Sequence, residues 1–285
     1  MGRSIRVIAP LLLATMPGLA SVQANPLPPS TGWQSESDST RCRVSRVFGE
    51  GEARHFLMLE RFAPDDRVHI TLAGPGAAEF TREARAQLDL GNGQPRIWGR
   101  PLVGEVAGFG SGLKLSAVSA SSGADKQEAV TGTITFAQRG EKIRLKDSSL
   151  DDALAALDNC AQALAASWGL EPAQLDSIIS APQWLNRRAV HRRIANTFAE
   201  RWHTSAPEDG IAHVRVIVNE AGQAENCTVV YAIAEMLPNE RACQIMHDAR
   251  FQPALDSAGK PVRAWYMVSF KDRRRNAQPG FWVPE

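Results

Sequence analysis

Short stretches of alternating apolar and polar residues dominate the chain from Arg41 to about Lys146. Alternation with a period of two places every second side chain on the same face of an extended strand. The segments with this pattern are Cys42–Phe48, His55–Arg61, Arg67–Ala73, Arg96–Trp98, Leu113–Val118, Val130–Phe136 and Lys142–Leu145. Clusters of Gly, Pro, Asp and Asn separate them, as expected for turns. This part of the chain is therefore predicted to be a β-rich domain.

The hydrophobic period changes to that of a helix after Ser149. Apolar residues then recur at helical spacing, namely Leu150, Leu154, Leu157, Ala161, Leu164 and Trp168. The segment Ser149–Asp152 fits an N-terminal capping signal, because an acidic residue follows the serine at the third position. We expect this helix to end at Gly169 and to close the β-rich domain.

A second helical pattern runs from Gln183 to Trp202, after residues 171–182, which we interpret as a linker. Its apolar residues near one face are Leu185, Ala189, Ile194 and Phe198, and its arginines are Arg187, Arg188, Arg192 and Arg193. Arginines at such positions usually form a solvated helix face, and contact with an anionic surface or partner is the alternative.

Strand patterns return at Gly210. Residues 211–218 alternate, with Ala212, Val214, Val216 and Val218 on one face, which predicts a half-buried strand. A turn at 219–223 and a second strand at 225–231 complete a hairpin. A helix follows from Pro238 and stops at Phe251-Gln252-Pro253, and a last strand runs from Pro261 to Lys271. The overall fold class is predicted to be α+β, with strand, strand, helix and strand in the C-terminal part.

The stretch Arg250–Val262 reads Arg-Phe-Gln-Pro-Ala-Leu-Asp-Ser-Ala-Gly-Lys-Pro-Val. Together with the Gly-led strand and the Gly turn before it, this stretch resembles the TonB C-terminal domain. Independently of the family, Phe251 is placed to anchor the end of the helix in the core, and Pro253 prevents the helix from continuing. The resemblance covers about a fifth of the chain, or about a third if the arginine-bearing helix is the leading helix of the domain.

The resemblance implies a binding mode in which an extended peptide adds to an exposed sheet edge. The last strand is the candidate edge, and the partner-binding candidates on it are Arg263, Trp265, Met267 and Ser269. The N-terminal half is similar to uncharacterised modules that accompany such domains in exported α-proteobacterial proteins, in three places: Trp33, Cys42–Gly49 and Cys160–Trp168. That second resemblance implies no function.

The first residues resemble a secretory signal, since Arg3 and Arg6 precede an apolar run from Val7 to Ala20 that is too short for an ordinary membrane span. We expect a signal peptide at residues 1–24 and a periplasmic protein, or an inner-membrane anchor facing the periplasm if the leader is retained. The further divisions are a Pro-rich linker at 25–32, a β-rich domain at 33–170, a linker at 171–182, a TonB-like domain at 183–275 and a tail at 276–285.

Export gives the cysteines a structural interpretation, because disulfides persist in oxidising compartments. Three pairings of Cys42, Cys160, Cys227 and Cys243 are possible, and the domain division favours Cys42 with Cys160 and Cys227 with Cys243. A zinc site is the alternative, although no CxxC pair or close Cys/His cluster occurs.

Motifs for catalysis are scarce. Gly108–Gly112 contains a serine but departs from the nucleophile-elbow pattern, and we interpret it as a flexible turn. The histidines His55, His69, His191, His203, His213 and His247 are scattered along the sequence. We therefore predict no catalytic residues, no metal and no cofactor. The 32 Lys and Arg balance 31 Asp and Glu, so the charge gives no reason to expect a nucleic-acid partner.

Three functions agree with these patterns. The first is a periplasmic binding or scaffold protein whose TonB-like domain recognises an extended segment of an envelope protein, such as an outer-membrane transporter. The second is a TonB-type energy transducer in transport, with an uncleaved leader as anchor. Such a transducer must cross the periplasm, but residues 25–31 of this chain would reach only about 20–25 Å as an extended spacer, well short of that distance. The third is an envelope hydrolase.

Overall fold

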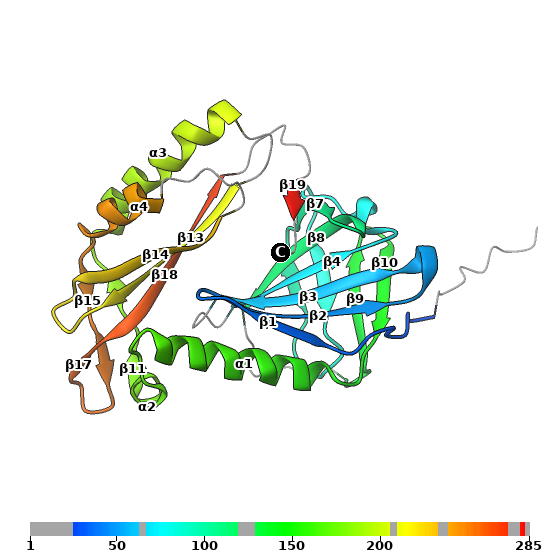
Figure 1. Cartoon of the computed structure of the whole chain (residues 1–285), viewed down its shortest axis with the longest axis horizontal. Helices are drawn as coiled ribbons and strands as arrows, with labels where there is room; N and C mark the ends of the chain where they lie inside the picture. The colour runs from blue at the N-terminus through cyan, green and yellow to red at the C-terminus, as the bar shows by residue number, and fades with distance from the viewer. Residues whose placement is uncertain are drawn as a thin grey trace, which may run out of the picture.

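A computed structural model of the chain describes residues 25–62, 67–118, 129–205, 210–232, 239–272 and 280–282. The predicted signal peptide at residues 1–24 lies outside these ranges. In the part that is described, strands predominate over helices. The β-rich region and the C-terminal sheet lie side by side, with the helix α1 (Leu150–Ser167) running beneath both of them in Figure 1.

A seven-stranded sheet forms one layer of the N-terminal domain. Its strands, in spatial order, are β1 (Gln34–Ser37), β2 (Cys42–Phe48), β3 (His55–Arg61), β4 (Arg67–Ala73), β8 (Gly110–Val118), β7 (Leu102–Val106) and β19 (Gly280–Trp282). Neighbouring strands are antiparallel except β19, which pairs parallel to β7. The segment 276–285, interpreted as a tail, therefore contributes a short strand to the N-terminal sheet.

The second layer is a four-stranded sheet in the order β10 (Glu141–Lys146), β9 (Thr133–Gln138), β5 (Ala86–Asp89) and β6 (Ile97–Gly99). Single-turn 3-10 helices also occur at η1 (Gly51–Ala53) and η2 (Ala77–Glu79). The inner faces of the two sheets share one core, which includes the fully buried Leu57, Ile70 and Phe136. Leu150 and Leu157 of α1 pack into the same core, so the helix covers the sheets as the period change predicted.

The start of α1 follows Ser149 as expected, but the serine does not cap the helix through its side chain. Its hydroxyl instead lies 3.0 Å from Asp147 Oδ1 and accepts a hydrogen bond of 2.9 Å from Arg46 Nη1. Arg46 also reaches the Asp147 carboxylate at 3.0 Å, and that carboxylate is fully buried. The capping prediction was wrong because a buried ion pair between β2 and the loop before the helix takes up the hydroxyl.

The C-terminal domain is built around a three-stranded sheet in the order β14 (Ala224–Ala232), β13 (Gly210–Val218) and β18 (Ala264–Asp272). Two helices accompany it, α3 (Arg187–Ser205) and α4 (Asn239–Met246). The smaller elements are α2 (Pro172–Asp176), β11 (Ile178–Ser180), β12 (Gln183–Trp184), β15 (Phe251–Gln252), β16 (Ala254–Asp256) and β17 (Pro261–Val262).

Two of these small strands lie before α3 and change the boundaries drawn from the sequence. β11 belongs to the segment interpreted as a linker, and it pairs with β16. β12 occupies the start of the predicted second helix and pairs with β15, so the helix begins at Arg187 rather than at Gln183. The segment before α3 is thus held to the C-terminal domain by backbone hydrogen bonds.

One face of the three-stranded sheet packs against the helices α3 and α4. The alternating Val214, Val216 and Val218 of β13 are fully buried there, together with Ile194 of α3 and Met246 of α4. The prediction of a half-buried strand was wrong, because the opposite face of β13 is buried as well. His213, Arg215 and Ile217 are also buried, because that face is turned toward the N-terminal domain and α1.

The turn between β13 and β14 explains the Gly-turn and Phe-x-Pro parts of the sequence motif. Phe251 is only 4% exposed and belongs to the core of the C-terminal domain, which confirms its predicted anchoring role. Its backbone N–H donates to the Gly222 carbonyl at 2.8 Å. Gly222 has φ +75°, and a Cβ atom on it would lie 2.0 Å from the Phe251 carbonyl oxygen. Only glycine fits this close approach.

Candidate functional site

The strand β18 forms one edge of the C-terminal sheet. Its nine residues pair with β13 along the whole length of both strands, from Gly210 opposite Asp272 to Val218 opposite Ala264. In the described parts of the chain, no strand pairs with the other side of β18. An edge of this kind presents backbone N–H and C=O groups that can pair with another extended chain. The last strand is therefore a sheet edge, as expected.

The candidate side chains on and before β18 do not form an open surface. Met267 is only 7% exposed and packs, with the half-buried Trp265, against Phe62 of the N-terminal domain. Arg263 precedes the strand and places its guanidinium 3.3 Å from the carboxylate of Glu225. Ser269 lies opposite His213 in the ladder, and its side chain is outside the described set. Partner binding through these side chains stays a prediction.

Where the two domains meet, four strands bring buried polar side chains together. Lys114 of β8 donates a hydrogen bond of 2.7 Å to the Glu60 carboxylate of β3, and the two side chains are 4% and 2% exposed. His69 of β4 and His213 of β13 lie beside this pair, with ring centroids 5.2 Å apart. We call Glu60, His69, Lys114 and His213 the junction cluster.

An aromatic ring and a second cation complete the surroundings of the junction cluster. The Phe62 ring stacks on His213 at 5.0 Å and meets His69 edge-on at 5.1 Å. Arg41 approaches the second oxygen of Glu60 at 3.4 Å. Glu60 therefore accepts charge-assisted contacts from two cations, which offset the cost of burying its carboxylate.

The surroundings of His213 disfavour its charged form. Burial is the largest cause that lowers its pKa well below the usual value, and electrostatic interaction with His69 and Lys114 acts in the same direction. Arg67 adds to this effect, while Glu60 opposes it. His213 is consequently neutral at neutral pH, and protonation there would place another cation in a buried cluster.

Arg215 forms a second polar contact between the domains. Its guanidinium carbon lies 3.4 Å from the centroid of the Trp168 ring at the end of α1, an arrangement that is typical of cation–π interaction. Its Nη2 is 3.3 Å from the Thr228 hydroxyl. The side chain is buried, and burial lowers its pKa to about 10. Arg215 stays charged at neutral pH and connects β13 to α1.

Both predicted disulfides are confirmed. Cys42 of β2 is bonded to Cys160 of α1, with 6.1 Å between their Cα atoms. Cys227 of β14 is bonded to Cys243 of α4, with 5.4 Å between their Cα atoms. The alternative of a cysteine-ligated zinc site is thereby wrong, because all four thiols are used in bridges. Each bridge fastens a helix to a strand of its own domain.

The serine in the Gly-rich segment and the scattered metal-ligand residues do not form a recognisable catalytic or metal site in the described residues. The turn predicted at Gly108–Gly112 is confined to residues 107–109, because β8 begins at Gly110. Ser111 is therefore in a strand, and its hydroxyl lies 3.3 Å from Glu105. Within the ranges that the structure describes, no group of three or more His, Cys, Asp or Glu side chains is arranged to hold a metal ion. The absence of catalysis and of a metal stays a prediction.

The arginines of α3 are exposed. Arg193 pairs with Asp248 at 2.7 Å, while Arg187, Arg188 and Arg192 line a shallow hollow of about 560 Å³ beside His191. Burial is the larger cause that lowers the pKa of His191, and the charge of Arg187 adds to it. A solvated helix face accounts for these contacts without a partner.

Sequence reasoning missed the junction cluster. Its histidines are far apart in sequence, and each occupies a single position in an ordinary strand. The available signal is the alternation itself, which places His213 and Arg215 on the same face of β13. That signal identifies a polar face but does not say what covers it.

The fold is a small α+β domain whose three-stranded sheet has the nine-residue strands β14 and β18 at its two edges. Residues 205–271 match the family described as Gram-negative bacterial TonB protein C-terminal. The match confirms the resemblance for this part of the chain and indicates a TonB-like, envelope-related protein. No curated protein matches the chain. The likeness of the N-terminal half to α-proteobacterial modules stays a prediction.

No helix in the described ranges is long and apolar enough to span a membrane.

Proposed function

We propose that the protein is exported to the periplasm, where it binds an extended segment of another envelope protein by adding it as a strand beside β18. The observation that carries this proposal is the position of β18, whose nine residues have a neighbouring strand on one side in the described chain. Backbone hydrogen bonds would provide the affinity in this arrangement, and side chains near the edge would select the partner. The protein acts by binding and not by catalysis.

The packing of the sheet limits how a partner can approach. One face of the sheet is covered by α3 and α4, and the other lies against the N-terminal domain through Trp265 and Met267. Contact with either face would require the molecule to open, whereas pairing at the edge would not. The structure thus favours recognition through the backbone of β18 over recognition through the side chains of its faces.

A photo-crosslinking residue in place of Arg263 tests this proposal in intact cells. Arg263 is partly exposed and lies directly before β18, so a partner paired with the strand would be within reach. The matched control carries the same residue in place of Arg188 on α3, which covers the other face of the sheet. We expect one envelope protein to be captured from the first site only. Capture of the same protein with equal yield from both sites would contradict the proposal.

A pair of proline variants tests the backbone pairing itself. Neighbouring residues in an antiparallel edge strand direct their N–H groups alternately toward the paired strand and away from it. Of Ser269→Pro and Phe270→Pro, one removes an inward N–H and the other an outward N–H. The outward variant should retain its thermal unfolding midpoint and lose the crosslinked partner. An outward variant that still captures the partner at full yield would exclude backbone pairing.

Sequencing of the mature N-terminus tests the periplasmic assignment. A mature chain that begins at Asn25 supports export with cleavage. A retained leader instead favours the second function, a TonB-type energy transducer anchored in the inner membrane, for which the match of residues 205–271 is the supporting observation.

A further inference from the structure

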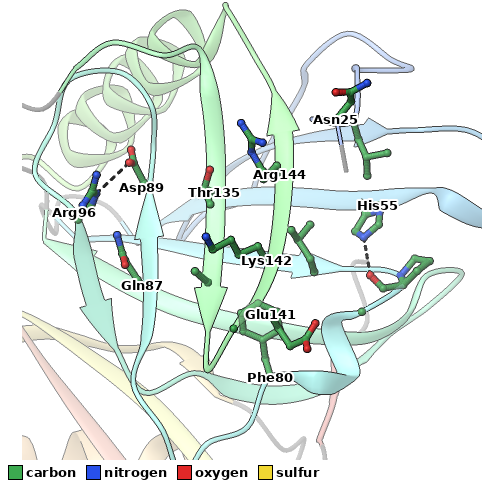
Figure 2. A pocket seen from close by; sticks show the side chains of 16 residues that line it. Asn25, His55, Phe80, Gln87, Asp89, Arg96, Thr135, Glu141, Lys142 and Arg144 are labelled. Atoms are coloured by element: carbon green, nitrogen blue, oxygen red, sulfur yellow. Dashed lines mark hydrogen bonds and ion pairs between the residues drawn. The ribbon is translucent and has the colours of Figure 1, made fainter. Parts of the chain in front are cut away.

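The outer face of the four-stranded sheet carries polar side chains that the core does not use. In β9, Ile134 and Phe136 point into the core and are fully buried, so Thr135 and Ala137 lie on the outer face. The same alternation places Gln87 of β5 on that face. A hollow of about 900 Å³ runs over this face and toward the end of the domain at His55 and Phe80 (Figure 2).

Cross-strand pairing arranges these side chains in two rows. One row runs across the whole sheet through the directly opposed residues Lys142, Ala137, Gln87 and Trp98. The second row contains Arg144, Thr135 and Asp89. Neighbouring strands are about 4.8 Å apart, so the first row spans about 14 Å from β10 to β6. A surface of this length accommodates a short chain of linked units rather than one small molecule.

Trp98 gives the first row a large apolar surface at one end. It is 54% exposed, although it sits opposite Gln87 and next to the half-buried Ile97. A single exposed apolar residue is not by itself evidence of a binding site. Here, however, the indole is adjacent to an amide that can both donate and accept hydrogen bonds. A flat ring beside such groups suits the faces of a sugar ring, which present C–H groups, while its rim carries hydroxyls.

The charges on this face select for an acidic ligand. Asp89 is already paired with Arg96 at 3.2 Å, as Figure 2 shows. Lys142 is exposed and Arg144 half-buried, and neither forms an ion pair with another residue of the described chain. Glu141 also lines the hollow, but it alternates with Lys142 along β10 and lies near Phe80 in Figure 2. Two cations on neighbouring positions of one strand face therefore remain available for carboxylates.

We propose that this face binds an oligosaccharide chain that carries carboxylate groups. Trp98 stacks on one sugar ring, Gln87 and Thr135 form hydrogen bonds with hydroxyls, and Lys142 and Arg144 pair with the carboxylates. The site lies on the N-terminal domain and does not depend on strand pairing at β18. It gives the β-rich domain a ligand of its own.

An acidic peptide is a poorer occupant of this face. A bound peptide strand gains its affinity from a sheet edge, and its side chains need apolar pockets. The two rows instead cross the middle of the sheet, where backbone groups are already paired between β9 and its neighbours β5 and β10. Apart from Trp98 at one end, the apolar residue of the two rows is the small Ala137, so the rows form no apolar pockets between β10 and β5.

Isothermal titration of the full chain tests the proposal. The probes are an oligogalacturonate as acidic sugar chain, a neutral cello-oligosaccharide of equal length, and poly-glutamate. We expect the oligogalacturonate to bind more tightly than the other two. Trp98→Ala should weaken that binding at least tenfold, whereas Ile179→Ala, which removes an exposed apolar side chain in the other domain, should not. The double variant K142Q/R144Q should bind the acidic and neutral sugars equally.

Two results would overturn the proposal. One is the absence of binding to both sugar chains. The other is binding of poly-glutamate that equals that of the oligogalacturonate and is unaffected by Trp98→Ala, which would identify a general anion surface. Thermal unfolding of each variant confirms that it is folded, because both rows lie outside the core.

Cosedimentation with purified peptidoglycan sacculi distinguishes two sources of an acidic sugar chain. Sedimentation that depends on Trp98 places the ligand in the cell wall. Binding of the soluble oligogalacturonate alone places it among secreted acidic polysaccharides. The same rows of side chains would serve in either case.

Discussion

The buried ion pair of the junction cluster permits a stability prediction whose size follows from the structure. In Lys114→Met, Glu60 would lose its hydrogen bond of 2.7 Å while its side chain remains 2% exposed. Removal of one partner from a buried ion pair typically costs about 3–5 kcal/mol, because a charge is left uncompensated. Arg41 still lies 3.4 Å from the second oxygen of Glu60, so the lower end of that range, about 3 kcal/mol, is expected.

Thermal unfolding of the oxidised full chain measures this effect. A loss of about 3 kcal/mol corresponds to a decrease in the midpoint of roughly 6–12 °C for a chain of this size. The matched control is Lys142→Met, where an exposed lysine should change stability by less than about 0.5 kcal/mol. The double variant Glu60→Leu with Lys114→Met should be more stable than Lys114→Met, since it removes both charges of the pair and leaves no carboxylate buried without its lysine. A midpoint for Lys114→Met equal to that of the control would refute the reasoning.

Three further predictions concern the turn, the second disulfide and the buried histidine. Gly222→Ala should lower the free energy of unfolding by about 3 kcal/mol, because its Cβ is strained at positive φ and contacts the backbone. Gly259→Ala has a similar φ of +74° but nothing near its Cβ, so it should cost about 1 kcal/mol. Equal losses for the two variants in urea unfolding would count against the role of the backbone contact. Replacement of Cys227 and Cys243 by serine opens a bridge between residues 16 positions apart and should lower the free energy of unfolding by about 3 kcal/mol. An unchanged melting midpoint would argue against a stabilising bridge. Burial holds the pKa of His213 below 6.5, so at acidic pH the unfolded chain binds more protons than the folded chain. The free energy of unfolding therefore falls as the pH decreases below about 6.5, by up to about 1.4 kcal/mol per pH unit. His213→Leu should flatten that slope between pH 7.5 and 5.5, and an unchanged slope would assign it to other groups.

The strands that the sequence predicts well are those with strong alternation. The bounds of β2, β3 and β4 agree with the predicted segments, because each contains several buried apolar residues at period two. Other strands escaped prediction. β1 has four polar residues, all exposed, and β7 is interrupted by Gly104 and Glu105, so neither shows the apolar alternation on which the prediction depends. Backbone pairing with a neighbour holds these strands in place instead.

The disulfides could be predicted because each pair lies within one domain, so the division of the chain was enough to choose between pairings. The junction cluster could not, since it depends on how two domains pack. His213 and Arg215 alternate with valines in β13, a pattern that normally indicates a solvated face. The face of Trp265 and Met267 was interpreted as a partner surface because the family resemblance implies binding at the edge formed by the last strand. Only the tertiary contact with Phe62 shows that this face is covered.

The bridge between Cys42 and Cys160 has a mechanical consequence. The two cysteines are 118 positions apart, and the bond closes that part of the chain into a loop. When the chain is pulled from its two ends, the loop cannot extend, which removes about 400 Å of contour length at ~3.3–3.6 Å per residue. The tension passes instead from β2 through the bond to α1, and from there into the C-terminal domain. While the bridge is intact, a load applied at β18 cannot unravel the strands between β2 and α1.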